Sequence, residues 1–175
     1  HHNDTIREDW KVTLVETGAE TMTGYRVKSA ARFIDGDNFM VTYGDAVSDT
    51  DLRSLYEFHL SHGLKGTVTG VFPPSRFGDL VTAGERVVSF NEKSDHQEHR
   101  EPINGGYFVF RREFLDMIPD DPSADLERIP MRMLTEEKQL AVYRHKGFWQ
   151  CMDTYRDNQL LEKMWKENPV WKLWD

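Results

Sequence analysis

The chain has 175 residues, of which 38% are hydrophobic and 30% are charged, and its formal net charge at pH 7 is −8. This length predicts one domain with a hydrophobic core, and the ten Phe, six Tyr and five Trp exclude a disordered acidic tail. The negative charge argues against general nucleic-acid binding, which depends on basic patches that displace counterions. The single cysteine, Cys151, excludes an intramolecular disulfide and is typical of a reducing compartment.

The N-terminal residues and the apolar segments bear on whether the protein spans a membrane or is secreted. The sequence contains no run of about 18 apolar residues and no apolar segment typical of a signal peptide, so we expect neither a membrane span nor secretion. The chain opens with HHNDTIREDW and not with an initiator Met. The two histidines are therefore either a tag remnant or part of the interior of a longer protein.

The predicted elements alternate between strands and helices along the chain. We expect strands at 11–18, 38–45, 66–72, 86–93, 105–110 and 139–145, and helices at 22–34, 50–63, 111–118 and 152–165. The run at 38–45 is short and apolar, which is typical of a strand buried on both faces. The strand, helix and strand between 38 and 72 predict a right-handed crossover with parallel strands. The fold class is therefore α/β, with a mixed, mainly parallel sheet flanked by helices.

Two aspartates in separate segments are candidate metal ligands. Asp45 follows a predicted strand and Gly44, and ligands of open parallel sheets bind beyond the carboxyl ends of strands. Asp153 begins a predicted helix in GFWQCMDTYRD. Two such carboxylates could hold one Mg²⁺, which also takes phosphate oxygens and waters. Helix capping is the alternative explanation for Asp45 and Asp153 from the local sequence. Asp45, Asp49 and Asp51 are cap candidates for one helix, and Asp153 is the candidate for the other.

Three further segments have both an ordinary and a functional interpretation. FNEKS ends a predicted strand with a Glu–Lys pair that is either a surface pair or a contact for sugar hydroxyls and phosphate. FPPSRFGDL is typical of a rigid turn, and INGGYFVF places glycines where a strand begins, which indicates a close approach to the backbone. No Walker motif, G-x-G-x-x-G, H-E-x-x-H or G-x-S-x-G occurs in the sequence.

Taken in order, eight stretches resemble the glucose-1-phosphate cytidylyltransferases, which are sugar nucleotidyltransferases that make CDP-glucose. These stretches are WKVTLVETG, MTGYRV, TYGDAVSD, FPPSRFG, FNEK, INGGYFVF, GFWQCMDTYRD and the terminal WKLWD. Each stretch alone is weak, but the eight in this order are specific to the family and extend from residue 10 to residue 175. The resemblance implies a Rossmann-like nucleotidyltransferase fold, with 154–175 as a C-terminal helix and aromatic tail.

The resemblance also implies roles for individual residues. It makes Asp45 and Asp153 the ligands of a catalytic Mg²⁺ and adds Lys93 as the group that contacts phosphate. The substrates would be CTP and glucose 1-phosphate, whose phosphate oxygen attacks the α-phosphorus of CTP. The remaining positions implied by the family are Glu92 for sugar hydroxyls, Asn104, Gly105, Arg76, Phe77 and Gly78 for the sugar pocket, and Thr17, Gly18, Thr23 and Gly24 for the nucleoside or triphosphate.

One family motif does not occur in these 175 residues. The Gly-rich L-A-G-G-x-G-T-R-L loop, which surrounds the triphosphate, is not found. We therefore expect this chain to be the C-terminal part of such an enzyme, a single domain without its N-terminal third, and to have little activity alone. The resemblance further implies a cytoplasmic homo-oligomer that serves O-antigen and lipopolysaccharide synthesis and binds neither nucleic acid nor membrane.

Two alternatives remain open at the level of sequence. The chain could be a non-catalytic module that binds a sugar nucleotide or assembles with a partner. It could also be a sugar-1-phosphate nucleotidyltransferase that uses UTP or dTTP in place of CTP.

Overall fold

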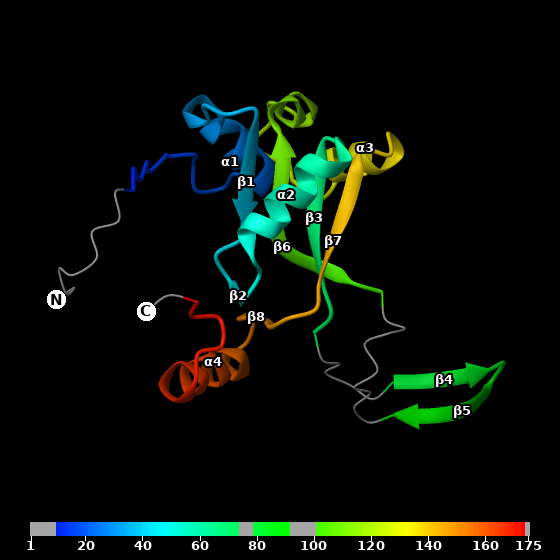
Figure 1. The fold of residues 1–175 in the computed structure, drawn as a ribbon. Coiled ribbons are helices and arrows are strands. Elements are labelled where there is room, and N and C mark those ends of the chain that lie inside the picture. The colour runs from blue at the N-terminus through cyan, green and yellow to red at the C-terminus, as the bar shows by residue number, and fades with distance from the viewer. Residues whose placement is uncertain (1–9, 74–78, 92–100, 174–175) are drawn as a thin grey trace.

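A four-stranded sheet with the order β1–β6–β3–β7 forms the centre of the computed structural model, which describes residues 10–73, 79–91 and 101–173 (Figure 1). Three strands run in the same direction, namely β1 (Asn38–Thr42), β3 (Gly66–Val71) and β7 (Leu140–His145). The fourth, β6 (Ile103–Arg111), is antiparallel to both of its neighbours, β1 and β3. The helices α1 (Thr23–Ala30), α2 (Leu52–His62) and α3 (Ile129–Glu136) lie around this sheet. The predicted α/β class with a mixed sheet flanked by helices is confirmed, and three of the four strands share one direction.

The predicted crossover from β1 through α2 to β3 is present, although the two strands are not neighbours. The later strand β6 lies between them and pairs with both. Among the described strands, β3 and β7 form the hydrogen-bonded parallel pair.

Local contacts define both ends of α2, and the prediction of Asp51 as a cap is confirmed. The Asp51 carboxylate accepts hydrogen bonds from the backbone N–H groups of Arg53 and Ser54 at 2.9 and 3.2 Å. At the other end, Gly63 has a φ of 70°, a left-handed conformation that is typical of a glycine after a helix. Leu55 and His59 are the buried residues of the helix, so this face packs onto the sheet.

The hydrophobic core lies around β6, because this strand lies between β1 and β3 and most of its residues are buried. Phe110 stacks on Phe114 with ring centroids 4.0 Å apart, and Phe108 lies parallel to Phe110 at 5.6 Å. The buried residues of this cluster are Phe39, Phe108, Phe110, Phe114, Leu115, Ile118, Ala124, Leu126 and Leu134. The expectation that 38–45 is buried on both faces is wrong, since Phe39 is buried but Met40 is 43% exposed. In the described structure, β1 is an edge strand.

Residues 11–18 do not form the predicted strand. They have no regular structure, and the side chains of Val12 and Leu14 are exposed. A strand needs a hydrogen-bonded partner, and no described strand pairs with this segment. Alternating apolar residues alone therefore did not decide its conformation.

Other predicted boundaries differ from the structure in smaller ways. The helix expected at 22–34 is α1 followed by the 3₁₀ helix η1 (Ala31–Phe33), and the helix expected at 111–118 is the 3₁₀ helix η3 (Arg112–Met117). The strand expected at 86–93 is β5 (Arg86–Asn91), which pairs with β4 (Asp79–Ala83) in a hairpin outside the main sheet. The helix α3 was not predicted.

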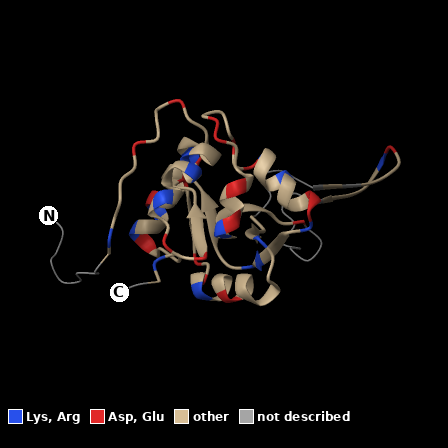
Figure 2. Cartoon of the chain, turned by 90° about the horizontal axis from the view of Figure 1, so that it is seen from above, with Lys and Arg blue, Asp and Glu red and all other residues tan. Residues whose placement is uncertain are grey.

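A short antiparallel ribbon lies near the ends of β1 and β7 (Figure 1). It consists of β2 (Ala46–Ser48) and β8 (Trp149–Cys151), and α4 (Tyr155–Glu167) follows it as predicted. Figure 2 shows acidic and basic residues interspersed over the helices. Within the described ranges, no helix is long and apolar enough to cross a membrane.

Candidate functional site

The ribbon brings the two predicted metal ligands, Asp45 and Asp153, to one end of the molecule. Asp45 comes immediately before β2, and Asp153 follows shortly after β8. The strands pair with Ala46 opposite Cys151, and the N–H of Met152 donates to the carbonyl of Asp45 at 2.8 Å. Two turns that lie far apart in the sequence are thereby joined by backbone hydrogen bonds. Both aspartates are exposed.

The structure also shows that neither aspartate caps a helix. Asp51 caps α2, and Thr154 caps α4 in a capping box with Asp157. The hydroxyl of Thr154 accepts from the N–H of Asp157 at 3.2 Å, and the carboxylate of Asp157 accepts from the N–H of Thr154 at 3.0 Å. The capping interpretation is therefore right for Asp51 and wrong for Asp45 and Asp153.

The two exposed carboxylates fit the chemistry of a Mg²⁺ site. Mg²⁺ usually takes one or two carboxylates and completes its octahedron with waters and substrate phosphates. Among the described residues, the Asp153 carboxylate accepts a hydrogen bond from the thiol of Cys151 at 3.4 Å. The described residues contain no group of three or more His, Cys, Asp or Glu that could hold a metal ion.

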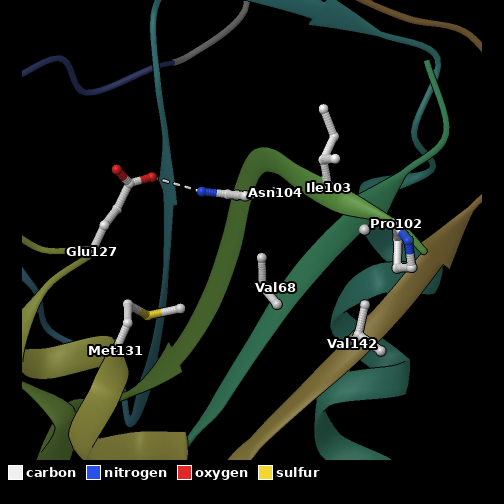
Figure 3. A pocket seen from close by; sticks show the side chains of 8 residues that line it. Val68, Pro102, Ile103, Asn104, Glu127, Met131 and Val142 are labelled. Carbon is white, nitrogen blue, oxygen red and sulfur yellow. Dashed lines mark hydrogen bonds between the residues drawn. The ribbon is translucent and has the colours of Figure 1, made fainter. Parts of the chain in front are cut away.

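A pocket of about 370 Å³ opens on the sheet beside the start of β6. Figure 3 shows Asn104 and Glu127 directed toward each other across it, and the Asn104 side-chain amide donates to the Glu127 carboxylate at 2.7 Å. The side-chain oxygen of Asn104 accepts from the N–H of Gly106 at 2.9 Å, which fixes the orientation of the amide. The residues that line the pocket are Val68, Gly70, Pro102, Ile103, Asn104, Glu127, Met131 and Val142. The pocket is thus an apolar hollow with one polar pair.

Glu127 connects this pocket to the turn that contains Asp45, and it was not predicted from the sequence. Its carboxylate accepts a second hydrogen bond from the Tyr43 hydroxyl at 3.0 Å. Burial, followed by the negative charge of Glu127, raises the pKa of Tyr43 well above its usual value, and Asp45 adds to the effect. The hydroxyl therefore stays protonated and serves as a donor. Locally, Glu127 is an exposed acid before a helix, so no local signal distinguishes it.

Gly105, which was predicted to line the sugar pocket, is next to the lining residue Asn104 but is not itself among the lining residues, and it has a packing role. A Cβ on Gly105 would lie 2.6 Å from Cγ1 of Val71 and 3.0 Å from the carbonyl of Thr69. The carbonyl of Gly105 accepts a hydrogen bond from the indole N–H of Trp149 at 2.8 Å. Since Trp149 belongs to β8, this bond ties the pocket wall to the ribbon.

Of the four residues predicted to contact the nucleotide, Thr23 and Gly24 lie in α1 and contact the segment just before Glu127. The hydroxyl of Thr23 accepts from the N–H of Leu126 at 3.0 Å, next to Glu127, and a Cβ on Gly24 would lie 2.8 Å from the carbonyl of Ala124. Thr17 and Gly18 lie in the preceding loop, where Thr17 accepts from Arg26 at 3.3 Å.

Five predicted contacts cannot be placed. Arg76, Phe77, Gly78, Glu92 and Lys93 lie outside the described residues. Their assignment to phosphate or sugar stays a prediction from the resemblance.

Known proteins similar to this chain are nucleotidyltransferases. The family model described as nucleotidyl transferase matches residues 6–166. The glucose-1-phosphate cytidylyltransferase of Salmonella typhimurium is 41% identical over all of this chain, which covers 67% of that protein. A Bacillus subtilis protein assigned the same activity is 38% identical, with 95% of this chain and 65% of that protein aligned. The chain therefore spans about two thirds of the length of these relatives.

Solved structures show the same fold at lower sequence identity. A Bacillus anthracis structure assigned as a glucose-1-phosphate thymidylyltransferase has a TM-score of 0.63 at 15% identity, covering 86% of this chain and 63% of that one. The inositol-1-phosphate CTP transferase of T. maritima has a TM-score of 0.52 at 13% identity, covering 84% and 62%. The expected nucleotidyltransferase fold is confirmed.

Proposed function

Because this chain belongs to the nucleotidyl transferase family and to its glucose-1-phosphate cytidylyltransferase branch, we propose that the protein makes CDP-glucose and pyrophosphate from CTP and α-D-glucose 1-phosphate. The Asp45 and Asp153 carboxylates would hold Mg²⁺, and the Asn104 pocket would receive the glucosyl group. The proposal concerns the whole protein, of which these residues correspond to about two thirds of a relative's length.

The observation that carries this proposal is the pairing of β2 with β8. It joins the turn of Asp45, which follows β1, to the turn of Asp153, which follows β8, and both side chains are exposed there. Open α/β sheets bind their ligands beyond the carboxyl ends of their strands. Helix capping, the ordinary explanation for such aspartates, is carried out by Asp51 and Thr154.

The pocket supports the sugar assignment through its polar pair. The Glu127 carboxylate already accepts from Asn104 and Tyr43 on one oxygen, Oε1. A carboxylate has about four acceptor sites, so Glu127 retains capacity for a hydroxyl of the sugar. Val68, Met131 and Val142 line the apolar side, against which the C–H face of a hexose would rest.

The proposed reaction needs positioning and charge neutralisation, without a covalent enzyme intermediate. A phosphate oxygen of glucose 1-phosphate forms a bond to the α-phosphorus of CTP, the bond to the bridging oxygen breaks, and pyrophosphate leaves with the electron pair. Bound Mg²⁺ would neutralise negative charge on the phosphate oxygens. Asp45 and Asp153 would hold the Mg²⁺ at the ribbon, and Asn104 and Glu127 would hold the sugar. The resemblance assigns Lys93 to the phosphate.

The test is the substitution of each aspartate by its amide in the protein at its natural length. We expect Asp45→Asn and Asp153→Asn to abolish Mg²⁺-dependent formation of CDP-glucose, measured as pyrophosphate release. Both variants should remain folded by circular dichroism, because neither side chain caps a helix. Near-normal turnover in both variants would falsify the metal assignment.

The nucleotide is tested in the same assay with CTP, UTP and dTTP. A preference for UTP or dTTP would overturn the choice of CTP while leaving the reaction class intact. The 175 residues should also be assayed alone, and we expect little activity because the Gly-rich triphosphate loop does not occur in them.

A further inference from the structure

The β2–β8 ribbon, which places Asp45 and Asp153 at one end, is too short to hold its own position. Each strand has three residues, and none of them is fully buried. An isolated two-stranded ribbon is at best marginally stable in water. Its position relative to the sheet therefore depends on contacts with other elements.

Such contacts lie at the opposite end of the ribbon, where the chain leaves β2 and enters β8. His145, the last residue of β7, places its Nε2 atom 2.9 Å from Oδ1 of Asp49. The same nitrogen lies 3.2 Å from the carbonyl of Phe148 and 3.3 Å from the hydroxyl of Ser48. A carboxylate and a carbonyl can only accept hydrogen bonds, so Nε2 must carry the hydrogen. We call Ser48, Asp49 and His145 the ribbon latch.

The latch is partly buried, with the side chain of His145 10% exposed and that of Asp49 30% exposed. Oδ1 of Asp49 is itself a buried oxygen that has no hydrogen bond of regular geometry within the described residues. The nearby His145 N–H therefore compensates electrostatically for the burial of this oxygen. The N–H of Asp49 and the hydroxyl of Ser48 both donate to the carbonyl of Phe148, at 3.2 and 2.9 Å. Since β7 is part of the main sheet, the latch joins the ribbon to that sheet.

Gly147 allows the latch to close. A Cβ at this position would lie 2.4 Å from Oδ1 of Asp49 and 2.7 Å from Cε1 of His145. Real Cβ atoms essentially never come this close to other heavy atoms. A methyl group on Gly147 would therefore separate Asp49 from His145.

We propose that Asp49 and His145 are positioning residues that lock the ribbon against the end of β7 and so hold Asp45 and Asp153 in the arrangement that binds a divalent cation. This inference rests on the proposed function, because it concerns the cation that the two aspartates would bind. The latch residues touch neither aspartate side chain and act through the backbone of the ribbon.

The experiment compares Mn²⁺ binding by variants of the protein at its natural length, followed by the loss of the free-ion EPR signal. We expect Asp49→Asn, His145→Gln and Gly147→Ala to weaken binding about 10- to 100-fold, as is typical for partners that orient metal ligands. The matched control is Glu137→Gln. Glu137 pairs with Lys65 at 2.9 Å, near the starts of β3 and β7 and so at the opposite end of the sheet from the ribbon.

A second readout separates positioning from a loss of structure. In a positioning role, the Mg²⁺ concentration for half-maximal rate rises while the KM for glucose 1-phosphate stays constant. If the latch residues act only on stability, their substitution lowers the folded fraction. The Mg²⁺ concentration for half-maximal rate and the KM for glucose 1-phosphate then stay unchanged in the protein that remains folded. Ser48→Ala, which removes only a hydroxyl, provides a milder variant if the others do not fold.

The outcomes distinguish this inference from the proposed function. Wild-type Mn²⁺ affinity in folded Asp49→Asn and His145→Gln overturns the latch, and the metal site stands if Asp45→Asn in the same series loses binding. Wild-type affinity in both Asp45→Asn and Asp153→Asn instead overturns the proposed metal site, and the latch inference with it.

Discussion

The four-stranded sheet and the β2–β8 ribbon are stabilised in opposite ways. The central strands β3 and β6 are mostly buried, and aromatic rings such as Phe108, Phe110 and Phe114 stack along them. The ribbon strands have no fully buried residue, and their contacts with the rest of the molecule include the latch and hydrogen bonds from the Trp149 indole to the Gly105 carbonyl and from the Tyr107 hydroxyl to the Ala46 carbonyl. Next to the ribbon, Phe148 stacks on Trp171 with ring centroids 5.5 Å apart.

This difference separates stability from function. Burial of apolar surface supplies most of the free energy of folding, so the sheet should dominate stability. The ribbon contributes little burial, but it alone carries Asp45 and Asp153. Substitutions in the sheet should therefore lower the free energy of unfolding, and substitutions in the ribbon should alter metal dependence.

The largest effect on stability is expected for Phe110→Ala. Phe110 is fully buried against Phe108 and Phe114, and truncation of such a ring leaves a cavity, which costs about 3–5 kcal/mol of unfolding free energy. Urea denaturation measures the loss. Phe90→Ala is the matched control, because Phe90 is 67% exposed on the hairpin and should change stability little. A loss below about 1 kcal/mol would contradict the assignment of the core to β6.

The second prediction concerns pH and the buried contact between α2 and the sheet. Nε2–H of His59 donates to the Asn38 amide oxygen at 3.1 Å, so Nδ1 accepts from the Thr67 hydroxyl at 2.8 Å and the ring is neutral. Burial, followed by the neighbouring His62 and Arg111, lowers the pKa of His59 to about 4. As the pH is lowered, His59 becomes protonated at about pH 6.5 in the unfolded chain but only at about pH 4 in the folded protein.

Stability should therefore fall as the pH drops from about 6.5 toward 4, by about 1–3 kcal/mol from His59. Urea denaturation at pH 7.5 and at pH 4.5 measures the change. His59→Asn should be less stable at pH 7.5 but should lose less than the wild type between the two pH values. Equal losses in the two proteins would show that His59 does not titrate in this way.

The smallest effect is expected for Asp51→Ala, which removes the cap of α2. Two backbone N–H groups lose their acceptor, and the expected cost is about 1 kcal/mol. Asp153→Asn is the comparison, because Asp153 caps nothing and should leave the unfolding free energy unchanged while it abolishes the proposed activity. A stability loss in Asp153→Asn as large as that in Asp51→Ala would erase the distinction between the two regions.

Local chemistry was sufficient to predict several elements from the sequence. The acid at 51 and the glycine at 63 marked the ends of α2, because caps act within a few residues of the helix. The apolar runs predicted β3, β6 and β7 and hence the class of the fold. Alternation at 11–18 failed as a predictor, because a strand also requires a partner elsewhere in the chain.

The sequence by itself determined the capped helix, the strands of the sheet and, through eight ordered motifs, the family to which the chain belongs. Tertiary structure alone decided that Asp45 and Asp153 come together at one end of the ribbon, because that arrangement depends on β2 meeting β8. It also decided that Glu127 joins Asn104 and that Asp49 meets His145. These contacts join residues far apart in the chain, and no local pattern encodes which distant side chains the folded sheet will bring together.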